Sequence, residues 1–316
     1  MKKIIFIIGI LSLLMLIGCE TEEKKTIQTT YIGGQSGLIA SFIEGAPPSE
    51  IFDNNQYPFG IAIKLENKGE FDIAVDAGYV EMLGFNPTDL GTTQANLKKN
   101  IGLMKGTKKN FDGSVLNGDS TVIEFNDLNY AVNLPGDLDL KVRANTCYDY
   151  ATKVSTKICV KKDLLSTSKA ICEISGEKDV ANSGAPIHIT SFKENPIGSN
   201  KLQFTFVIEK VGETNDRFFK KSTDCLDTAT NMNKNIIHVK ITSGVGGISP
   251  SCTGFREGSG SEGDVMLYDG APRTVTCTVD TTNVQGEFED FMNIELGYRY
   301  MQFIEKSIVI KDVSTS

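Results

Sequence analysis

The chain has 316 residues, of which 40% are hydrophobic and 23% charged, a balance typical of folded proteins and not of disordered or multi-span membrane chains. Its formal net charge of -8 argues against the clustered basic residues that nucleic-acid binding needs, so we expect no nucleic-acid partner. Trp is absent and His occurs only twice, which leaves few groups for His-metal or Ser-His chemistry. The length suits two domains of roughly 130–150 residues.

Residues 1–18 have the pattern of a signal peptide. Lys2 and Lys3 precede an apolar run, Ile4–Ile17, that is too short to span a bilayer. The run ends in a four-residue motif, Leu16-Ile17-Gly18-Cys19. This motif resembles the lipobox of prokaryotic lipoproteins, which implies that Cys19 carries diacylglycerol, becomes the N-terminus after cleavage, and anchors the protein on a membrane. An uncleaved helix, or ordinary cleavage beside a coincidental Cys19, is the alternative.

Residues 19–30 are expected to be the lipidated cysteine and a short polar tether. Cleavage removes two lysines and changes the net charge from -8 to -10. An anionic membrane repels such a body, so attachment depends on the lipid. We therefore expect an extracytoplasmic, membrane-anchored protein on the cell surface or in the envelope.

Short β-branched or alternating runs, separated by Gly, Pro, Asn and Asp, predict strands along the whole body. In chain order, the predicted strands are Ser36–Ile43, Phe59–Glu66, Thr121–Asn126, Leu138–Thr146, Thr156–Val160, Lys201–Glu209, Asn235–Thr242, Asp264–Leu267, Arg273–Val279, Asn293–Tyr300 and Ser307–Ile310. Only Pro87–Leu103 has some helical character, and Asn117-Gly118-Asp119 predicts a hairpin turn.

A weak internal repeat organises these strands. The segment Phe59–Glu70 matches Leu202–Glu213 at an offset of 143 residues, and Tyr148-Asp149-Tyr150 matches Tyr298-Arg299-Tyr300 at an offset of 150. Alternating apolar residues turn one face of each strand inward, so two such sheets can pack as a sandwich. We interpret the tyrosines as core and corner residues, with a ligand role as the alternative.

The segment Phe59–Glu70, with its alternating aliphatic residues, resembles the opening strands of immunoglobulin-like modules of the CARDB type in bacterial and archaeal cell-surface proteins. The resemblance implies an all-β fold of two tandem immunoglobulin-like sandwiches that serve as spacers or binding platforms. We place these at residues 31–165 and 185–313, with a linker at residues 166–184. No functional residue is carried over, because the shared motif concerns the fold.

The six cysteines of the body favour disulfides in an exported chain, and mixed free and paired thiols or a metal site are the alternatives. We expect Cys147 to pair with Cys159 across a short connection centred near Lys153. Cys252–Cys277 in the second copy and, by elimination, Cys172–Cys225 complete the set.

No phosphate loop, dinucleotide fingerprint, nucleophile elbow or zinc motif occurs, so we expect no cofactor, no metal and no catalytic residue. His188 is isolated, and His238 reads as an ordinary strand residue. The sequence therefore predicts a non-catalytic lipoprotein that binds, adheres or supports the envelope, with envelope or surface proteins as partners. A solute- or carbohydrate-binding lipoprotein of a transport system is the alternative, and a surface hydrolase a weaker one.

Overall fold

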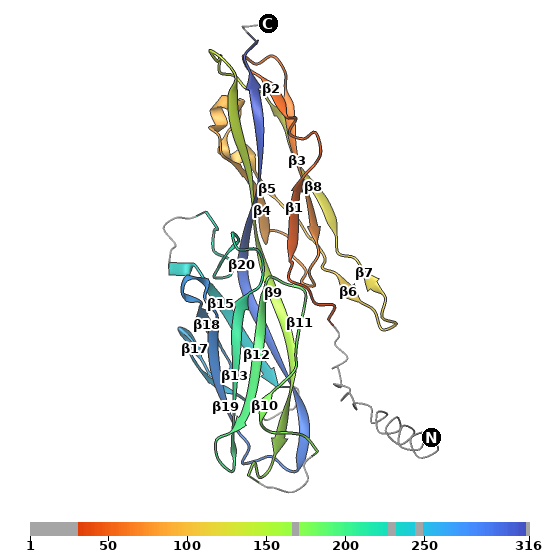
Figure 1. The fold of residues 1–316 in the computed structure, drawn as a ribbon, viewed down its shortest axis with the longest axis vertical. Helices are drawn as coiled ribbons and strands as arrows, with labels where there is room; N and C mark the ends of the chain where they lie inside the picture. Colours follow the sequence, from red (N-terminus) through yellow and green to blue (C-terminus); the bar gives the residue numbers. More distant parts are fainter. Residues whose placement is uncertain (1–30, 166–170, 227–231, 244–248, 314–316) are drawn as a thin grey trace, which may run out of the picture.

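The structure is a computed structural model, which describes residues 31–165, 171–226, 232–243 and 249–313. These residues form an elongated body of two β lobes, called the upper and lower lobe after their places in Figure 1. Within the described ranges there is no α-helix, and the predicted all-β class is confirmed. Short 3-10 helices are η2 (Pro87–Leu90), η3 (Gln94–Leu97) and η5 (Tyr268–Gly270), the first two within the stretch with predicted helical character.

Two long strands, β9 (Leu138–Lys161) and β20 (Glu287–Lys311), run through both lobes (Figure 1). The other strands of the upper lobe are β1 (Leu38–Phe42), β2 (Glu50–Phe52), β3 (Phe59–Asn67), β4 (Gly78–Leu83), β5 (Lys98–Asn100), β6 (Lys108–Lys109), β7 (Val115–Leu116) and β8 (Ser120–Leu128). Those of the lower lobe are β10 (Gly176–Glu177), β11 (Val180–Asn182), β12 (Ile187–Pro196), β13 (Lys201–Lys210), β14 (Arg217–Phe219), β15 (Ile236–Ser243), β16 (Ser251–Thr253), β17 (Glu257–Ser259), β18 (Glu262–Met266) and β19 (Arg273–Asp280).

Each lobe combines a sheet of its own with one half of the sheet that the long strands share. The upper lobe has the antiparallel sheet β1-β3-β8, and the lower lobe has β10-β12-β13-β19-β16. The shared sheet has the order β17-β18-β15-β20-β9-β4-β5. Sheets that face one another across a common core are consistent with β-sandwich packing.

The predicted alternation places the apolar residues in the core. In β3, Ile61, Ile63 and Leu65 are fully buried, and in β13 Phe204, Phe206 and Ile208 are fully buried as well. The rings of Phe204 and Phe206 stack with Phe192 of β12 at centroid distances of 5.2 and 6.3 Å. Period-two patterning therefore fixes which face of each central strand turns inward.

The long strands merge elements that the sequence analysis predicts as separate. Leu138–Thr146 and Thr156–Val160 are parts of β9, and Asn293–Tyr300 and Ser307–Ile310 are parts of β20. The two strands pair antiparallel from Glu287↔Lys161 to Ile310↔Leu138. The second half of β9, which ends the first predicted unit, thus lies in the lower lobe. The second half of β20, which ends the second predicted unit, lies in the upper lobe.

The internal repeat coincides with an approximate two-fold relation. Asp149 pairs with Arg299, and the flanking tyrosines pair as Tyr148↔Tyr300 and Tyr150↔Tyr298. The two copies of the Tyr-x-Tyr motif therefore face each other across the centre of the ladder. The order β1-β3-β8 in the upper lobe recurs as β12-β13-β19 in the lower lobe.

The predicted hairpin turn at Asn117–Asp119 is wrong. This segment instead joins β7 to β8. The Asp119 carboxylate accepts the backbone N–H of Lys105 at 2.8 Å. The hairpin lies just before it, where β6 pairs with β7 through Lys108↔Leu116 and Lys109↔Val115. An Asx turn at Asp112, which accepts the N–H of Ser114 at 2.9 Å, closes that hairpin.

Candidate functional site

The predicted lipobox, Leu16, Ile17, Gly18 and Cys19, lies outside the described residues and stays a prediction. Within the described residues, no helix has the length and apolar character needed to cross a membrane.

All six cysteines of the body form disulfides. The predicted bridge Cys252–Cys277 is confirmed, and it joins directly opposed residues of β16 and β19. The predicted bridge Cys147–Cys159 is wrong, because both residues lie on the continuous strand β9 and the expected connection near Lys153 does not exist. Cys172–Cys225 is wrong for the same reason: Cys147 pairs with Cys225, and Cys159 pairs with Cys172.

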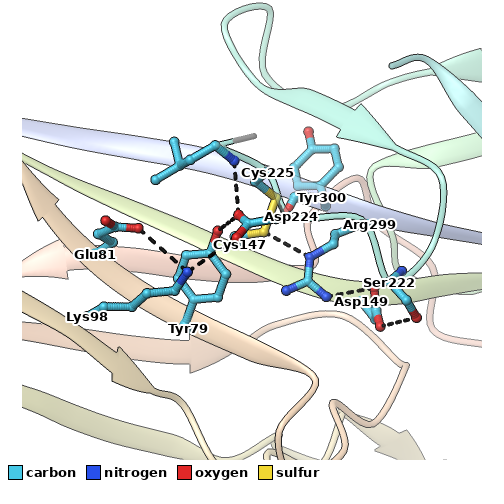
Figure 2. The surroundings of a disulfide bond; sticks show 11 residues. Tyr79, Glu81, Lys98, Cys147, Asp149, Ser222, Asp224, Cys225, Arg299 and Tyr300 are labelled. Carbon is cyan, nitrogen blue, oxygen red and sulfur yellow. Dashed lines mark hydrogen bonds and ion pairs between the residues drawn. A yellow bond between two sulfur atoms is a disulfide. The ribbon is translucent and has the colours of Figure 1, made fainter. Parts of the chain in front are cut away.

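The Cys147–Cys225 bridge ties the two lobes together at the waist, where β9 and β20 cross from one lobe to the other (Figure 2). Arg299 of β20 lies against it and donates from Nε to Cys147 Sγ at 3.0 Å. Its Nη1 also donates to Asp149 Oδ1 at 3.2 Å, and the same carboxylate accepts the N–H of Ser222 at 3.0 Å. The central Asp149–Arg299 pair thus holds the loop that carries Cys225.

A second polar clamp crosses the waist beside the bridge (Figure 2). The Tyr79 hydroxyl of β4 donates to Asp224 Oδ1 at 2.6 Å, and Lys98 Nζ lies 3.5 Å from Asp224 Oδ2. Burial and the bond to Asp224 raise the pKa of Tyr79 well above its usual value. Burial would raise the pKa of Asp224, but the bonds from Tyr79, Leu226 N–H and Lys98 outweigh it and lower that pKa. Each charge here has a partner, so the clamp holds the lobes together.

Four tyrosines fill the centre of the waist. Tyr148, Tyr150, Tyr298 and Tyr300 are each at most 1% exposed, which confirms their interpretation as core residues. Their cross-strand ring centroids lie 6.0 and 6.5 Å apart. Every hydroxyl has a hydrogen-bond partner: Leu38 N–H, Asn67 Oδ1, Thr152 Oγ1 and Asp216 Oδ2. Burial raises the pKa of all four.

A groove of about 470 Å³ opens beside this cluster, between the start of β1 and the middle of β20. The loop that follows β13 closes its lower end with Gly212, Glu213 and Asp216. Tyr300, Gln302 and Ile304 line its floor. The groove therefore lies between the lobes, where residues from both halves of the chain meet.

One wall of the groove is an open strand edge. In the described chain, β1 pairs with β3 alone. The carbonyl of Gly37 and the N–H of Ile43 bond to the β3 side, so the backbone groups of Ala40 and Phe42 point to the other side by strand alternation. On that side the N–H of Leu38 already bonds to the Tyr148 hydroxyl at 3.2 Å. The edge is open from Ala40 onward.

The opposite wall is also an unpaired edge. On this side, β20 pairs with β14 as far as Met301 and with β2 from Val309 onward. Between these two partners, residues 302–308 pair with β9 on one side and have no paired strand on the other among the described residues. An unpaired stretch bounded by two paired ones is a gap in the sheet.

The floor of the groove contains polar side chains that are partly or fully shielded from water. Burial raises the pKa of Asp216, despite the opposing hydrogen bond from the Tyr300 hydroxyl and the nearby charge of Lys210. The Nε2 atom of Gln302 is buried without any hydrogen-bond partner. The amide donor of Gln302 is costly to bury without a partner, whereas the Asp216 carboxylate already accepts the Tyr300 hydroxyl.

The two histidines lie elsewhere. His188 is half-buried, and its Nε2 lies 3.2 Å from the carbonyl of Gly34. His238 is a β15 residue as predicted, with its ring between Asp264 Oδ1 at 2.8 Å and Glu262 Oε1 at 3.0 Å. These carboxylates also pair with Lys220 and Lys240. Across the described ranges, no group of three or more His, Cys, Asp or Glu side chains is placed to hold a metal ion.

The groove and the gap in β20 were not predicted from the sequence. Neither has a local sequence signal, because each depends on which strands pair across more than a hundred residues. The nearest sequence feature is the repeat itself, which places Tyr300 and Gly212 in equivalent positions to Tyr150 and Gly69.

No family model matches the chain, and no curated protein matches it. The secreted serine protease VesC from Vibrio cholerae is 11% identical over 86% of this chain and 51% of its own, about half its length, with a TM-score of 0.19. A triple jelly roll protein of an archaeal virus is 9% identical over 85% of this chain and 90% of its own, with a TM-score of 0.13. The collagen-binding domain of the Erysipelothrix rhusiopathiae surface protein RspB is 10% identical over 89% of this chain and 90% of its own, with a TM-score of 0.12. Likenesses this weak assign neither a fold family nor an activity, so this chain is described by its own features: an all-β protein with three disulfides.

Proposed function

We propose that this protein is a cell-surface lipoprotein, anchored through Cys19, whose two-lobed body binds an extended segment of another envelope or surface protein without catalysis. The observation that carries the proposal is the groove at the waist with an unpaired strand edge on each side. Three disulfides support a location outside the cytoplasm, since structural disulfides persist in oxidising compartments.

Strand addition explains how such a groove binds a partner. An extended peptide gains backbone hydrogen bonds along an open edge, and pockets for alternate side chains supply the specificity. Here residues 302–308 of β20 offer a gap about as long as an ordinary strand of five or six residues. Filling that gap continues the shared sheet between β14 and β2.

The polar groups of the groove define the chemistry of the segment. Asp216 and Glu213 favour a Lys or Arg side chain at the lower end. The free Nε2–H groups of Gln302 need an acceptor, which a backbone carbonyl of the segment supplies. We therefore expect an extended segment with one basic residue and alternating apolar residues.

In-cell photo-crosslinking tests the groove. A photoreactive amino acid at Ile39, which is 40% exposed, is expected to capture an extended segment beside a Lys or Arg. Ala40→Pro removes an N–H from the open edge of β1 and should abolish the crosslink. Val122→Pro is the matched control, because it places proline on the outer edge of β8 in the same sheet. Equal crosslinking in both variants would contradict the proposal.

The anchor is tested in the same cells. Cys19→Ala is expected to end lipid incorporation and to move the protein to the medium or leave it as precursor. A correctly processed Cys19→Ala protein that stays on the membrane would contradict the anchoring.

A further inference from the structure

We propose that the β6–β7 hairpin, residues 108–116, is a second membrane contact that places Phe111 in the interface of an anionic bilayer. The inference rests on the proposed anchoring at Cys19, and it names the surface of the body that faces the lipid. It arises from three independent features of the hairpin: its exposed apolar side chains, its lysines and its position relative to the tether.

The tip of the hairpin exposes apolar side chains to an unusual degree. Phe111 is fully exposed, Leu116 is 59% exposed and Val115 is 51% exposed. A cluster of exposed apolar side chains on a soluble protein marks an interaction site. The hairpin projects from the waist, away from both lobes (Figure 1).

The turn that carries Phe111 is ordered by its own hydrogen bonds. Asn110 N–H donates to the Ser114 carbonyl at 2.8 Å, and the N–H of Ser114 donates to Asp112 Oδ1 at 2.9 Å. The Asn110 side chain also donates to Ser114 Oγ at 2.9 Å. These bonds hold the aromatic ring outward, so its exposure is built into the turn.

Lysines gather at the base of the hairpin, although the chain is acidic overall with a net charge of -8. Lys105, Lys108 and Lys109 lie within five positions, and Lys108 and Lys109 are both exposed. Lys108 forms an exposed ion pair with Asp72 at 3.4 Å, which is weak in water. An aromatic tip with flanking lysines is the combination that favours the lipid-water interface, where the ring enters the headgroup region and the amines meet lipid phosphates.

The tether reaches the body next to this hairpin. The Glu70 carboxylate accepts the N–H groups of Ile32 and Gly33 at 2.9 Å each, close to the start of the described chain. The neighbouring Gly69 carbonyl accepts the N–H of Thr107, at the base of the hairpin, at 2.7 Å. One turn therefore holds both the start of the described body and the hairpin, and both lie on the same side of the waist (Figure 1).

The length of the tether brings the hairpin to the membrane. Residues 20–30 separate Cys19 from Tyr31, and the twelve residue steps between them span at most about 43 Å when fully extended. A lipid on Cys19 thus keeps the waist within that distance of the bilayer, and a hairpin on the same side of the waist meets the lipid first. A second contact fixes the orientation of the body, which a single lipid anchor does not.

Fluorescence tests the insertion directly, because the chain contains no Trp. The mature chain, residues 19–316 with Cys19→Ser to prevent lipidation, carries Phe111→Trp as its sole indole. With vesicles of phosphatidylcholine and phosphatidylglycerol at about three to one, its emission is expected to shift to the blue by about 10 nm, with quenching by brominated lipid. Phe291→Trp is the matched control: Phe291 is 48% exposed on β20 in the lower lobe, and its emission should not change.

Co-sedimentation with the same vesicles measures the two contributions separately. Phe111→Ser is expected to lower the bound fraction at least about fivefold, and Phe291→Ser to leave it unchanged. Lys108→Glu with Lys109→Glu should lower it about as much at low salt and remove its dependence on phosphatidylglycerol. Thermal unfolding of each variant verifies that the body is intact.

Failure of this inference is distinguishable from failure of the anchor. If the indole at position 111 shows no shift while the lipidated protein fractionates with membranes, the hairpin proposal is overturned and the anchor stands. If the shift occurs but Cys19 carries no lipid in cells, the anchor is overturned and the hairpin contact stands.

Discussion

The two lobes share a strand plan but are closed in different ways. The lower lobe contains two disulfides of its own, Cys159–Cys172 and Cys252–Cys277, and a stack of three phenylalanines. Among the described residues the upper lobe has only Cys147–Cys225, which links it to its neighbour. Its closure depends instead on residues 302–311 of β20, which return from the far end of the chain.

The same strand order is therefore stabilised in two ways. Covalent bridges restrict the unfolded chain, whereas a returning strand adds buried surface and ladder hydrogen bonds only after a large loop has closed. We therefore expect the upper lobe to be the more sensitive one to changes in β20.

The largest effect is expected from deletion of residues 304–316. The deletion removes Ile308 and Ile310, which are at most 1% exposed, and the loss of each such side chain costs about 2–5 kcal/mol. Together with the lost ladder, this approaches the total stability of a domain. Hydrogen exchange should show loss of protection in β3 and β8 and retained protection in β13 and β19. A chain that lacks only residues 314–316 is the control, and persistent protection of β3 in the longer deletion would refute the comparison.

A smaller loss of stability is expected when a disulfide is removed. This loss should be greater for the bridge between the lobes than for a bridge within one lobe. Loop-closure entropy predicts a loss of about 4.5 kcal/mol for Cys147→Ala with Cys225→Ala, which opens a separation of 78 residues. The same calculation gives about 3 kcal/mol for Cys159→Ala with Cys172→Ala, which opens a separation of 13. Equilibrium unfolding in guanidinium measures both losses. The reverse order would mean that native contacts, and not chain closure, set the contribution of each bridge.

The smallest of these effects is a pH dependence of the lower lobe. Glu194 is fully buried, and burial raises its pKa to about 7 even though Lys178 Nζ lies 2.9 Å away and Cys159 N–H donates to it. The folded protein therefore binds this proton more tightly than the unfolded chain. Between about pH 4.5 and 7 the free energy of unfolding should fall as pH rises, by at most about 3 kcal/mol from this group. Glu194→Gln should flatten that slope, and an unchanged slope would assign it to other groups.

Much of the strand content could be predicted from the sequence, because burial of one face imposes a period of two on strands such as β3 and β13. The bridge Cys252–Cys277 was also predicted, on the ground that both residues lie in the second copy, and the structure places them opposite each other on β16 and β19. The repeat predicted that the Tyr-x-Tyr motifs are equivalent, but not that they face each other.

The sequence does not indicate which strands pair with one another. Asp149 and Lys153 look like turn residues between two short strands, yet Asp149 is held by Arg299 from a strand 150 positions away. The continuity of β9, the pairing of Cys147 with Cys225 and the gap in β20 all follow from that distant partner. Local patterns carry no information about such contacts, so the disulfide predictions that assumed a hairpin were wrong.

The path of β20 also sets the order in which the two lobes can complete their folding. Domains generally fold as units from the N-terminus onward while the chain is still being made. Here the lower lobe has all its strands once Met301 has emerged, whereas the upper lobe, whose first strand is the earliest described, waits for Lys311. The part of the body that is made first is therefore completed last. Until then the unpaired strand edges of the upper lobe remain accessible to molecular chaperones.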